Sequence, residues 1–376
     1  MRALRAFAAA QLAAVFITFA AAPPVLTHAA VRQTSAGAVE FTAIAGGLRE
    51  PWSLAFLPDG DFLITLRGGE MRRYKKDGRF SVVKNVPRVR ARGQGGLLDV
   101  MTPGDFGERG EIFLSFSKPQ GRRGGTALAR ARLRGDRLED VKVIWELETG
   151  SGGGRHYGSR IAEGPDGLIY FTVGDRGDRP SAQDLSRGNG SVIRVARDGS
   201  IPADNPFAGE KGASPGIWSY GHRNAQGAAF DARGRLWVAE HGAWGGDEVN
   251  LIRRGANYGW PVISYGRHYS GGKIGVGTAA SGMEQPEHYW DPSIAPSGMA
   301  FYSGDMFPEW EGDLLVGSLA FDLISRLTPD RGMEEAERIE TPETRRVRDV
   351  RVAPDGSVWF LSVGNGTLYR MAKPGR

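Results

Sequence analysis

Cysteine is absent from the 376 residues of the sequence. This absence excludes disulfide bonds, cysteine nucleophiles and cysteine-ligated metal centres. If the chain is exported, its fold must therefore be held by its own hydrophobic core. The sequence also lacks a phosphate-binding loop, the HExxH zinc motif and a dinucleotide-binding fingerprint, so the commonest nucleotide and zinc-protease chemistries are not indicated.

A large surplus of either charge is lacking too. Lys and Arg number 48 against 43 Asp and Glu, which gives a net charge of +5. Because no dense basic run contains interleaved aromatic residues, we expect no nucleic-acid partner. The short runs RVRAR (88–92) and RARLR (130–134) alternate like the faces of solvated strands, with an anion or membrane-surface patch as the alternative.

Long apolar stretches are missing except at the N-terminus. There, two arginines precede an apolar stretch from about Ala6 to Ala22, and small residues follow at Ala29–Ala30. This order predicts a secretory signal over about residues 1–30, a mature domain over 31–376, and a periplasmic or secreted location. A retained anchor is the alternative, but the run is short for a span, so we expect no stable membrane span after signal removal.

Glycine, in contrast, is abundant, with 55 residues spread along the chain. Turns of the Pro-Asp-Gly type join pairs of alternating apolar strands in six copies, which begin at Ser53, Gly96, Ser159, Gly227, Gly298 and Arg348. Their spacing suits four-stranded blades with variable loops and predicts an all-β, six-bladed β-propeller. We expect the segment Val39–Ile44 to pair with the last blade and close the ring. A long β-sandwich is the alternative fold.

Propellers place their active sites on the central channel, so residues that interrupt the repeat are the functional candidates. The first interruption, GGGRHYGSR, contains His156. Folding about the turn at Pro165–Asp166 places His156 opposite Asp175. A carboxylate fixes the tautomer of a histidine and raises its basicity, which is the arrangement of a general base. A histidine that merely caps a strand is the alternative.

Three further interruptions carry polar groups. SYGHRNAQG contains Arg223 and Asn224, which suit a planar, oxygen-rich ligand or else form a solvated loop. AEHGAWGGDEVNLIRRGANYGWP offers acidic and carbonyl oxygens among glycines, which suit calcium better than zinc, although the spacing is not that of an EF-hand. In TRRVRDV, Arg346 and Arg348 are expected on one strand face, where they could clamp carboxylates or simply be surface charge.

Taken together, these segments resemble the soluble quinoprotein glucose/sorbosone dehydrogenase family, and most closely its aldose sugar dehydrogenase branch. The likeness runs from about Val39 to Lys373. It is carried by the blocks PWSLAFLPDG, QGGLLDV, HYGSRIAEGPDGLIYFTVGD, SYGHRNAQG, DEVNLIRRGANYGWP, PSIAPSGMAFYSGD and VRDVRVAPDG. Several blocks in one order are more specific than any single motif.

The resemblance implies bound pyrroloquinoline quinone (PQQ), calcium, and oxidation of the anomeric hydroxyl of an aldose to a lactone by hydride transfer to the quinone. It implies that His156 is the base, oriented by Asp175, and that Arg223 stabilises charge on the quinone oxygen. The implied cofactor contacts are Gln94, Arg223, Asn224, His241, Tyr269, Ser318, Leu319, Arg346 and Arg348. The implied calcium ligands are the carbonyls of Gly242 and Ala243 at the cofactor, and Glu248 with the Tyr258 carbonyl at a second site.

Three departures from the family pattern stand out. A lysine that often lies near Ala320 is missing, and Arg326 or the Arg346/Arg348 pair would have to replace its charge. His241 and Ala243 stand where glutamine and proline are common. The expected electron acceptor is a quinone, a dye or a small cytochrome. The competing hypotheses are a calcium-dependent lactonase-type propeller, whose metal sits among several carboxylates, and a non-catalytic propeller that binds a polymer or protein.

Overall fold

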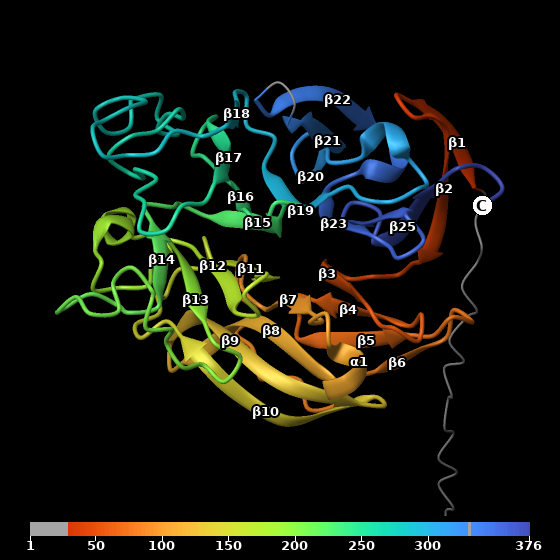
Figure 1. Ribbon diagram of the computed structural model, residues 1–376, viewed down its shortest axis with the longest axis horizontal. Coiled ribbons are helices and arrows are strands. Elements are labelled where there is room, and N and C mark those ends of the chain that lie inside the picture. Colours follow the sequence, from red (N-terminus) through yellow and green to blue (C-terminus); the bar gives the residue numbers. More distant parts are fainter. Residues whose placement is uncertain (1–28, 330–331) are drawn as a thin grey trace, which may run out of the picture.

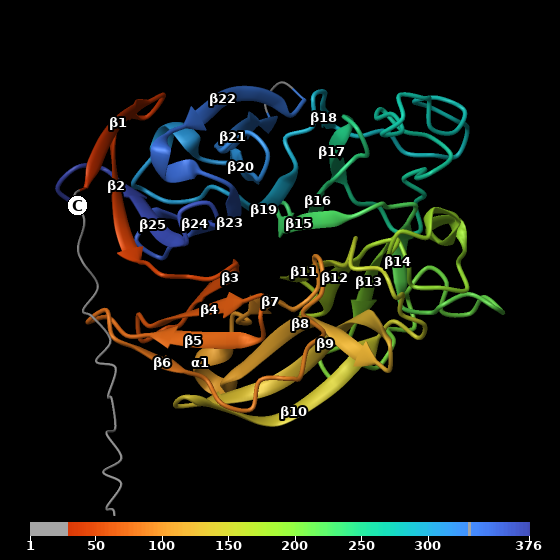
Figure 2. The same ribbon diagram turned by 180° about the vertical axis from the view of Figure 1, so that it is seen from behind.

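The computed structural model describes residues 29–329 and 332–376. The predicted signal segment therefore lies almost wholly outside the described residues. Within them, the strands form six antiparallel sheets arranged around a central axis, as Figures 1 and 2 show from opposite sides. The predicted six-bladed β-propeller is confirmed. No helix in the described part of the chain is long and apolar enough to cross a membrane.

Each blade is an antiparallel meander whose innermost strand contacts the innermost strands of both neighbouring blades. The first three blades, given from the inside outward, are β3 (Pro51–Phe56), β4 (Phe62–Leu66), β5 (Glu70–Tyr74) and β6 (Phe80–Val82); β7 (Leu97–Met101), β8 (Glu111–Gln120), β9 (Arg123–Arg134) and β10 (Arg137–Glu146); and β11 (Gly158–Glu163), β12 (Ile169–Val173), β13 (Ser191–Val195) and β14 (Ile217–Tyr220).

The other three blades follow the same order. They are β15 (Ala225–Phe230), β16 (Leu236–Glu240), β17 (Asp247–Leu251) and β18 (His288–Trp290); β19 (Pro296–Phe301), β20 (Leu314–Ser318), β21 (Leu323–Thr328) and β22 (Glu334–Glu340); and β23 (Val347–Val352), β24 (Val358–Ser362), β25 (Thr367–Ala372), β2 (Gly37–Ala45) and β1 (Ala30–Thr34). Short helical turns interrupt the connecting loops at α1 (Phe106–Arg109), η1 (Arg179–Gln183), η2 (Pro308–Trp310) and η4 (Pro342–Thr344).

The ring is closed by the N-terminal strands. β2 pairs with β25, with Phe41 opposite Met371, and β1 adds a fifth strand at the rim beside the C-terminus (Figure 1). The predicted role of Val39–Ile44 is thus confirmed. Phe41 is only 1% exposed and its ring packs edge-on against Phe360, so closure buries apolar surface as well as strand edges.

The prediction of a strand is wrong for one of the two short basic runs. Residues 130–134 lie in β9, as expected, but residues 88–92 form the extended loop between β6 and β7. This loop follows Pro87, which has no N–H for a sheet ladder, and Arg90 instead bonds through its main chain to Ser117 of β8. Alternation of charge alone could not reveal this difference.

The six inner hairpins share a feature that positions the site. Each shows a register shift within the first residues of its innermost strand, at 51–53, 97–100, 158–161, 225–227, 296–299 and 347–349. A β-bulge re-aims the side chains that it leaves unpaired. Four of the bulge residues, Trp52, Leu98, Gln226 and Arg348, line a cleft at the centre of the ring.

Candidate active site

The central cleft has a volume of about 370 Å³. Its wall is about equally polar and apolar and comes from all six blades or their connecting loops; it includes Trp52, Arg67, Gln94, Asn224, His241, Leu319, Arg346 and Arg348. A concave site of this size with a few convergent polar groups suits a small organic ligand.

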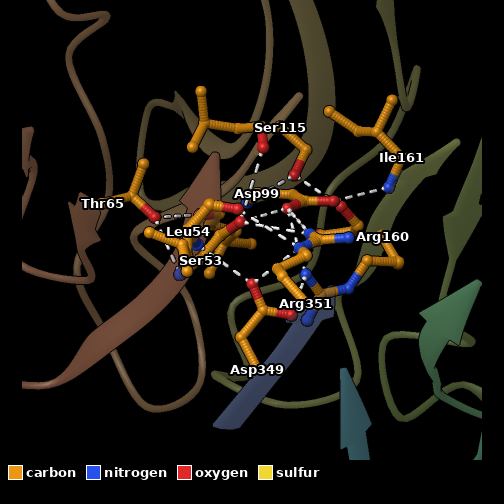
Figure 3. Close-up of polar contacts among 12 residues, drawn as sticks. Ser53, Leu54, Thr65, Asp99, Ser115, Arg160, Ile161, Asp349 and Arg351 are labelled. Carbon is orange, nitrogen blue, oxygen red and sulfur yellow. Dashed lines mark hydrogen bonds and ion pairs between the residues drawn. The ribbon is translucent and has the colours of Figure 1, made fainter. Parts of the chain in front are cut away.

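A buried ion network supports the cleft from the inner strands (Figure 3). Arg160 contacts Asp99 at 3.1 Å and Asp349 at 2.9 Å, and Arg351 contacts the same two carboxylates at 3.2 Å each. Asp99, Asp349 and Arg160 are all 0% exposed. Arg160 also stacks on Trp52, so the network fixes part of the cleft wall.

His156 and Asp175 meet as the sequence predicted. The Nδ1 atom of His156 lies 2.7 Å from Oδ1 of Asp175, and the main-chain N–H of His156 donates to Gln94 in the cleft wall at 2.6 Å. Near the turn, however, β11 and β12 pair residues whose numbers sum to 332, and the bulge restores the sum of 331 at Gly158 and Val173. The bulge therefore determines which residue faces His156.

The electrostatic surroundings keep the imidazole neutral. Burial lowers the pKa of His156, and the charge of Arg223 lowers it further, against the opposing hydrogen bond from Asp175. Burial alone would raise the pKa of Asp175, but the hydrogen bonds that it accepts, first from His156, hold its pKa below the ordinary value. A neutral histidine beside an ionised carboxylate is the state required of a general base.

Arg223 and Asn224 lie next to this pair. Asn224 lines the cleft and accepts the N–H of Gly158 at 3.2 Å. Arg223 is 5% exposed; it donates to the carbonyl of His241, and its Nε atom has no partner among the described residues. Its main-chain N–H donates to Glu240 at 2.7 Å. An unpaired buried donor of this kind is costly unless a ligand accepts from it.

A second, smaller cavity adjoins Arg223. Its lining includes His241, Gly242, Glu248, Tyr258 and Trp260. Burial, followed by the nearby charge of Glu240, raises the pKa of Glu248 to about 8. Ala243, which follows Gly242 in the chain, is also buried. Among the described residues, no group of three or more His, Cys, Asp or Glu side chains is arranged to hold a metal, so a cation here would need main-chain oxygens as well.

The two arginines at the start of β23 both reach the cleft, but they do not do so as alternate residues on one face of a regular strand. Arg346 precedes the strand with a φ of 51°, and Arg348 is the residue of the bulge. They do not share a strand face by simple alternation. Arg346 donates to the carbonyl of Leu319, and Arg348 donates to Oε1 of Gln226, both at 2.9 Å.

Other expected residues lie elsewhere. Tyr269 is 72% exposed and is not part of the cleft wall, while the Ser318 hydroxyl turns away to the carbonyl of Ile294. Arg326 cannot replace the missing lysine charge near Ala320, because it pairs with Asp313, just before β20, and with Glu337 on β22.

Several residues of the site are not predicted from the sequence. Trp52 and Arg67 line the cleft, and the indole N–H of Trp260 donates to Asp175. A position at the channel-facing end of an inner hairpin was the only available signal for Trp52 and Arg67. For Trp260, which lies far along the chain from Asp175, there was none.

The chain is similar to proteins of a known family. The family model described as glucose/sorbosone dehydrogenase matches residues 48–370, which span nearly all of the ring. The molecule is thus an oxidoreductase of the propeller sugar-dehydrogenase class. The chain belongs to the glucose/sorbosone dehydrogenase family.

Individual relatives cover most of the chain. It is 41% identical over 336 residues to an aldose sugar dehydrogenase of Escherichia coli, covering 86% of this chain and 90% of that protein. The apo-form structure of soluble aldose sugar dehydrogenase from Escherichia coli is 39% identical, with a TM-score of 0.85 over 89% of this chain and 99% of the other. The PQQ-bound aldose sugar dehydrogenase of Streptomyces coelicolor is 28% identical, with a TM-score of 0.73 over 93% and 99%.

Proposed function

We propose that this protein oxidises the anomeric hydroxyl of aldoses to lactones, with PQQ in the central cleft and His156 as the general base. The observation that carries the proposal is the 2.7 Å contact between His156 and Asp175, which the main-chain N–H of His156 ties to Gln94 in the cleft wall. A related protein of the same fold binds PQQ. We place the enzyme in the periplasm or outside the cell, with a quinone, a dye or a small cytochrome as electron acceptor.

The charges in the cleft fit a quinone that carries several carboxylates. The guanidiniums of Arg223, Arg346 and Arg348 give their hydrogen bonds to neutral oxygen atoms. Burial lowers the pKa of Arg348, and Arg160, Arg346 and Arg67 lower it further, so positive charge is in excess there. An anionic ligand would relieve this repulsion, and arginine binds carboxylates in a bidentate geometry. Gln94, Asn224, His241 and Leu319 complete the proposed contacts.

The second cavity fits a calcium ion. A carboxylate whose pKa rises to about 8 lacks a positive partner, and Glu248 would gain one if a cation bound. The proposed ligands are Glu248 and the Tyr258 carbonyl at this cavity, and the carbonyls of Gly242 and Ala243 nearer the cofactor.

In the proposed reaction, His156, Asp175 and Arg223 have separate roles. Bound PQQ would supply the oxidising power, as the acceptor of the hydride from the anomeric carbon. His156 takes the hydroxyl proton at Nε2, while Asp175 holds the proton on Nδ1 and stabilises the imidazolium that forms. Arg223 faces the developing negative charge as a fixed cation. The products are a lactone and a two-electron-reduced cofactor, so atoms and electrons balance.

Reconstitution tests this proposal against its two alternatives. Purified apo-protein is mixed with PQQ and calcium, and dye reduction is followed with a panel of aldoses; turnover that depends on both additions is expected. Lactone hydrolysis without dye reduction would instead indicate a lactonase. Inactivity in both assays would indicate a binding propeller.

A further inference from the structure

Asp175 makes hydrogen bonds through both of its carboxylate oxygens. Oδ1 accepts from the His156 ring at 2.7 Å and from the N–H of Gly177 at 2.6 Å. Oδ2 accepts from the indole N–H of Trp260 at 2.9 Å. Trp260 is 5% exposed and lies 85 residues further along the chain, in the loop between β17 and β18. The orientation of the His156 partner is therefore determined by a different blade.

Trp260 is itself held at its main chain. Its N–H donates to the carbonyl of Gly221 at 2.9 Å, and its carbonyl accepts from the Gln183 side chain at 2.8 Å. Gln183 and Asn257 form a reciprocal pair of amide hydrogen bonds at 2.9 and 2.8 Å. A reciprocal amide pair fixes both side chains, so the indole has little freedom to rotate away from Asp175.

The indole ring lies among cations as well. The guanidinium carbons of Arg223 and Arg179 are 5.3 and 5.2 Å from its ring centre. The edge of the Trp260 indole thus contacts Asp175, the carboxylate partner of His156. The face of the same ring contacts Arg223. No other indole N–H in the described residues reaches Asp175.

We propose that Trp260 is a positioning residue for the proton-transfer pair, acting through Asp175 and never on the sugar itself. Its N–H orients the carboxylate so that Oδ1 faces Nδ1 of His156, which leaves Nε2 free as the base. By sharing the negative charge of Asp175, it also limits how strongly the carboxylate stabilises a protonated His156. The inference depends on the proposed role of His156.

The charged groups around His156 set the direction of the expected effect. Burial lowers the pKa of the His156 imidazole most, and the charges of Arg223 and Arg155 lower it further, whereas Asp175 raises it. His241 also interacts electrostatically with His156. Loss of the indole N–H makes Asp175 a stronger acceptor, so the pKa of His156 should rise. The acid limb of turnover should then move to higher pH, because the base must be neutral.

Trp260→Phe tests this, since it removes the N–H and keeps an aromatic ring. The matched control is Trp290→Phe, because Trp290 is 3% exposed and donates its N–H to Glu335 at 3.2 Å, and neither residue lines the cleft. The pKa of His156 is measured by NMR in cofactor-free, metal-free protein, with its resonance assigned from the spectrum of His156→Gln. Trp260→Phe should raise this pKa by about half a pH unit, and Trp290→Phe should leave it unchanged.

Reconstituted enzyme gives the second readout, the acid limb of kcat/KM, which should shift in the same direction. An unchanged or lowered pKa of His156 in Trp260→Phe would overturn the inference. If that variant does not fold, Gln183→Met removes the bond to the Trp260 carbonyl and should raise the pKa by a smaller amount; no change there would overturn it equally. Failure of the proposed function is distinct, because reconstituted wild-type protein would then reduce no dye with aldoses while the NMR shift in Trp260→Phe persisted.

Discussion

Replacing Asp99 by asparagine should destabilise the propeller at its centre. Asp99 is 0% exposed and accepts hydrogen bonds from the Ser53 hydroxyl at 2.5 Å, the Ile161 N–H at 2.7 Å, and the guanidiniums of Arg160 and Arg351 at 3.1 and 3.2 Å (Figure 3). Asparagine has the same shape, but an NH₂ group replaces one of the two acceptor oxygens of Asp99. This NH₂ group then faces hydrogen-bond donors instead of accepting from them. Among the described residues, the substitution also leaves Asp349 as the only carboxylate paired with both guanidiniums.

The magnitude follows from the burial of this network. Removing one partner of a buried ion pair costs roughly 3–5 kcal/mol, because the remaining charge is left uncompensated in a medium of low polarity. At about 2.1 cal/mol/K of unfolding entropy per residue, a chain of this length should lose roughly 4–6 °C in Tm.

Differential scanning calorimetry and urea unfolding measure the loss. The control is Asp77→Asn, which breaks an ion pair with Arg79 whose side chains are 50% and 84% exposed, and which should leave Tm unchanged. If Asp99→Asn unfolds at the same temperature as the wild type, the central network contributes little to the stability of the fold.

Three further results are expected. Phe41→Ala should cost about 3–5 kcal/mol in urea unfolding, because it empties a 1%-exposed site on the strand that closes the ring; a loss below 1 kcal/mol would contradict this. Arg348→Met should weaken PQQ binding by about 10- to 100-fold in a fluorescence titration, because a charge-assisted bond is lost, and unchanged affinity would place the cofactor elsewhere. The acid limb of kcat/KM should lie below pH 6.5, because burial and Arg223 lower the pKa of His156; a limb above that value would contradict the assigned base.

Local signals predicted most of the fold. Alternating apolar residues and turn chemistry located all six inner hairpins, since both act over a few residues. The closing strand near Phe41 was predictable because an open propeller would leave sheet edges unpaired. The register of strand pairing was harder to predict. In the pairing near the turn, the partner of His156 would have been Arg176, and only the bulge between Gly158 and Ile161 makes it Asp175.

The site was predictable where its residues lie at the ends of inner strands, and not where long loops carry them. Tyr269 and Trp260 both belong to the long connection between β17 and β18, yet the first is exposed and the second donates to Asp175. Arg346 reaches the cleft through a left-handed φ, which simple strand alternation does not foresee. Tertiary packing decides each of these cases.

The most direct test of the central claim compares wild type and His156→Gln in two parallel measurements, equilibrium binding of PQQ and steady-state oxidation of an aldose with a dye as acceptor. Binding should be retained, because the proposed cofactor contacts lie on other residues, while turnover should fall by at least about 100-fold with the loss of the base. Normal turnover in His156→Gln would contradict the claim, and so would a wild-type protein that binds no PQQ.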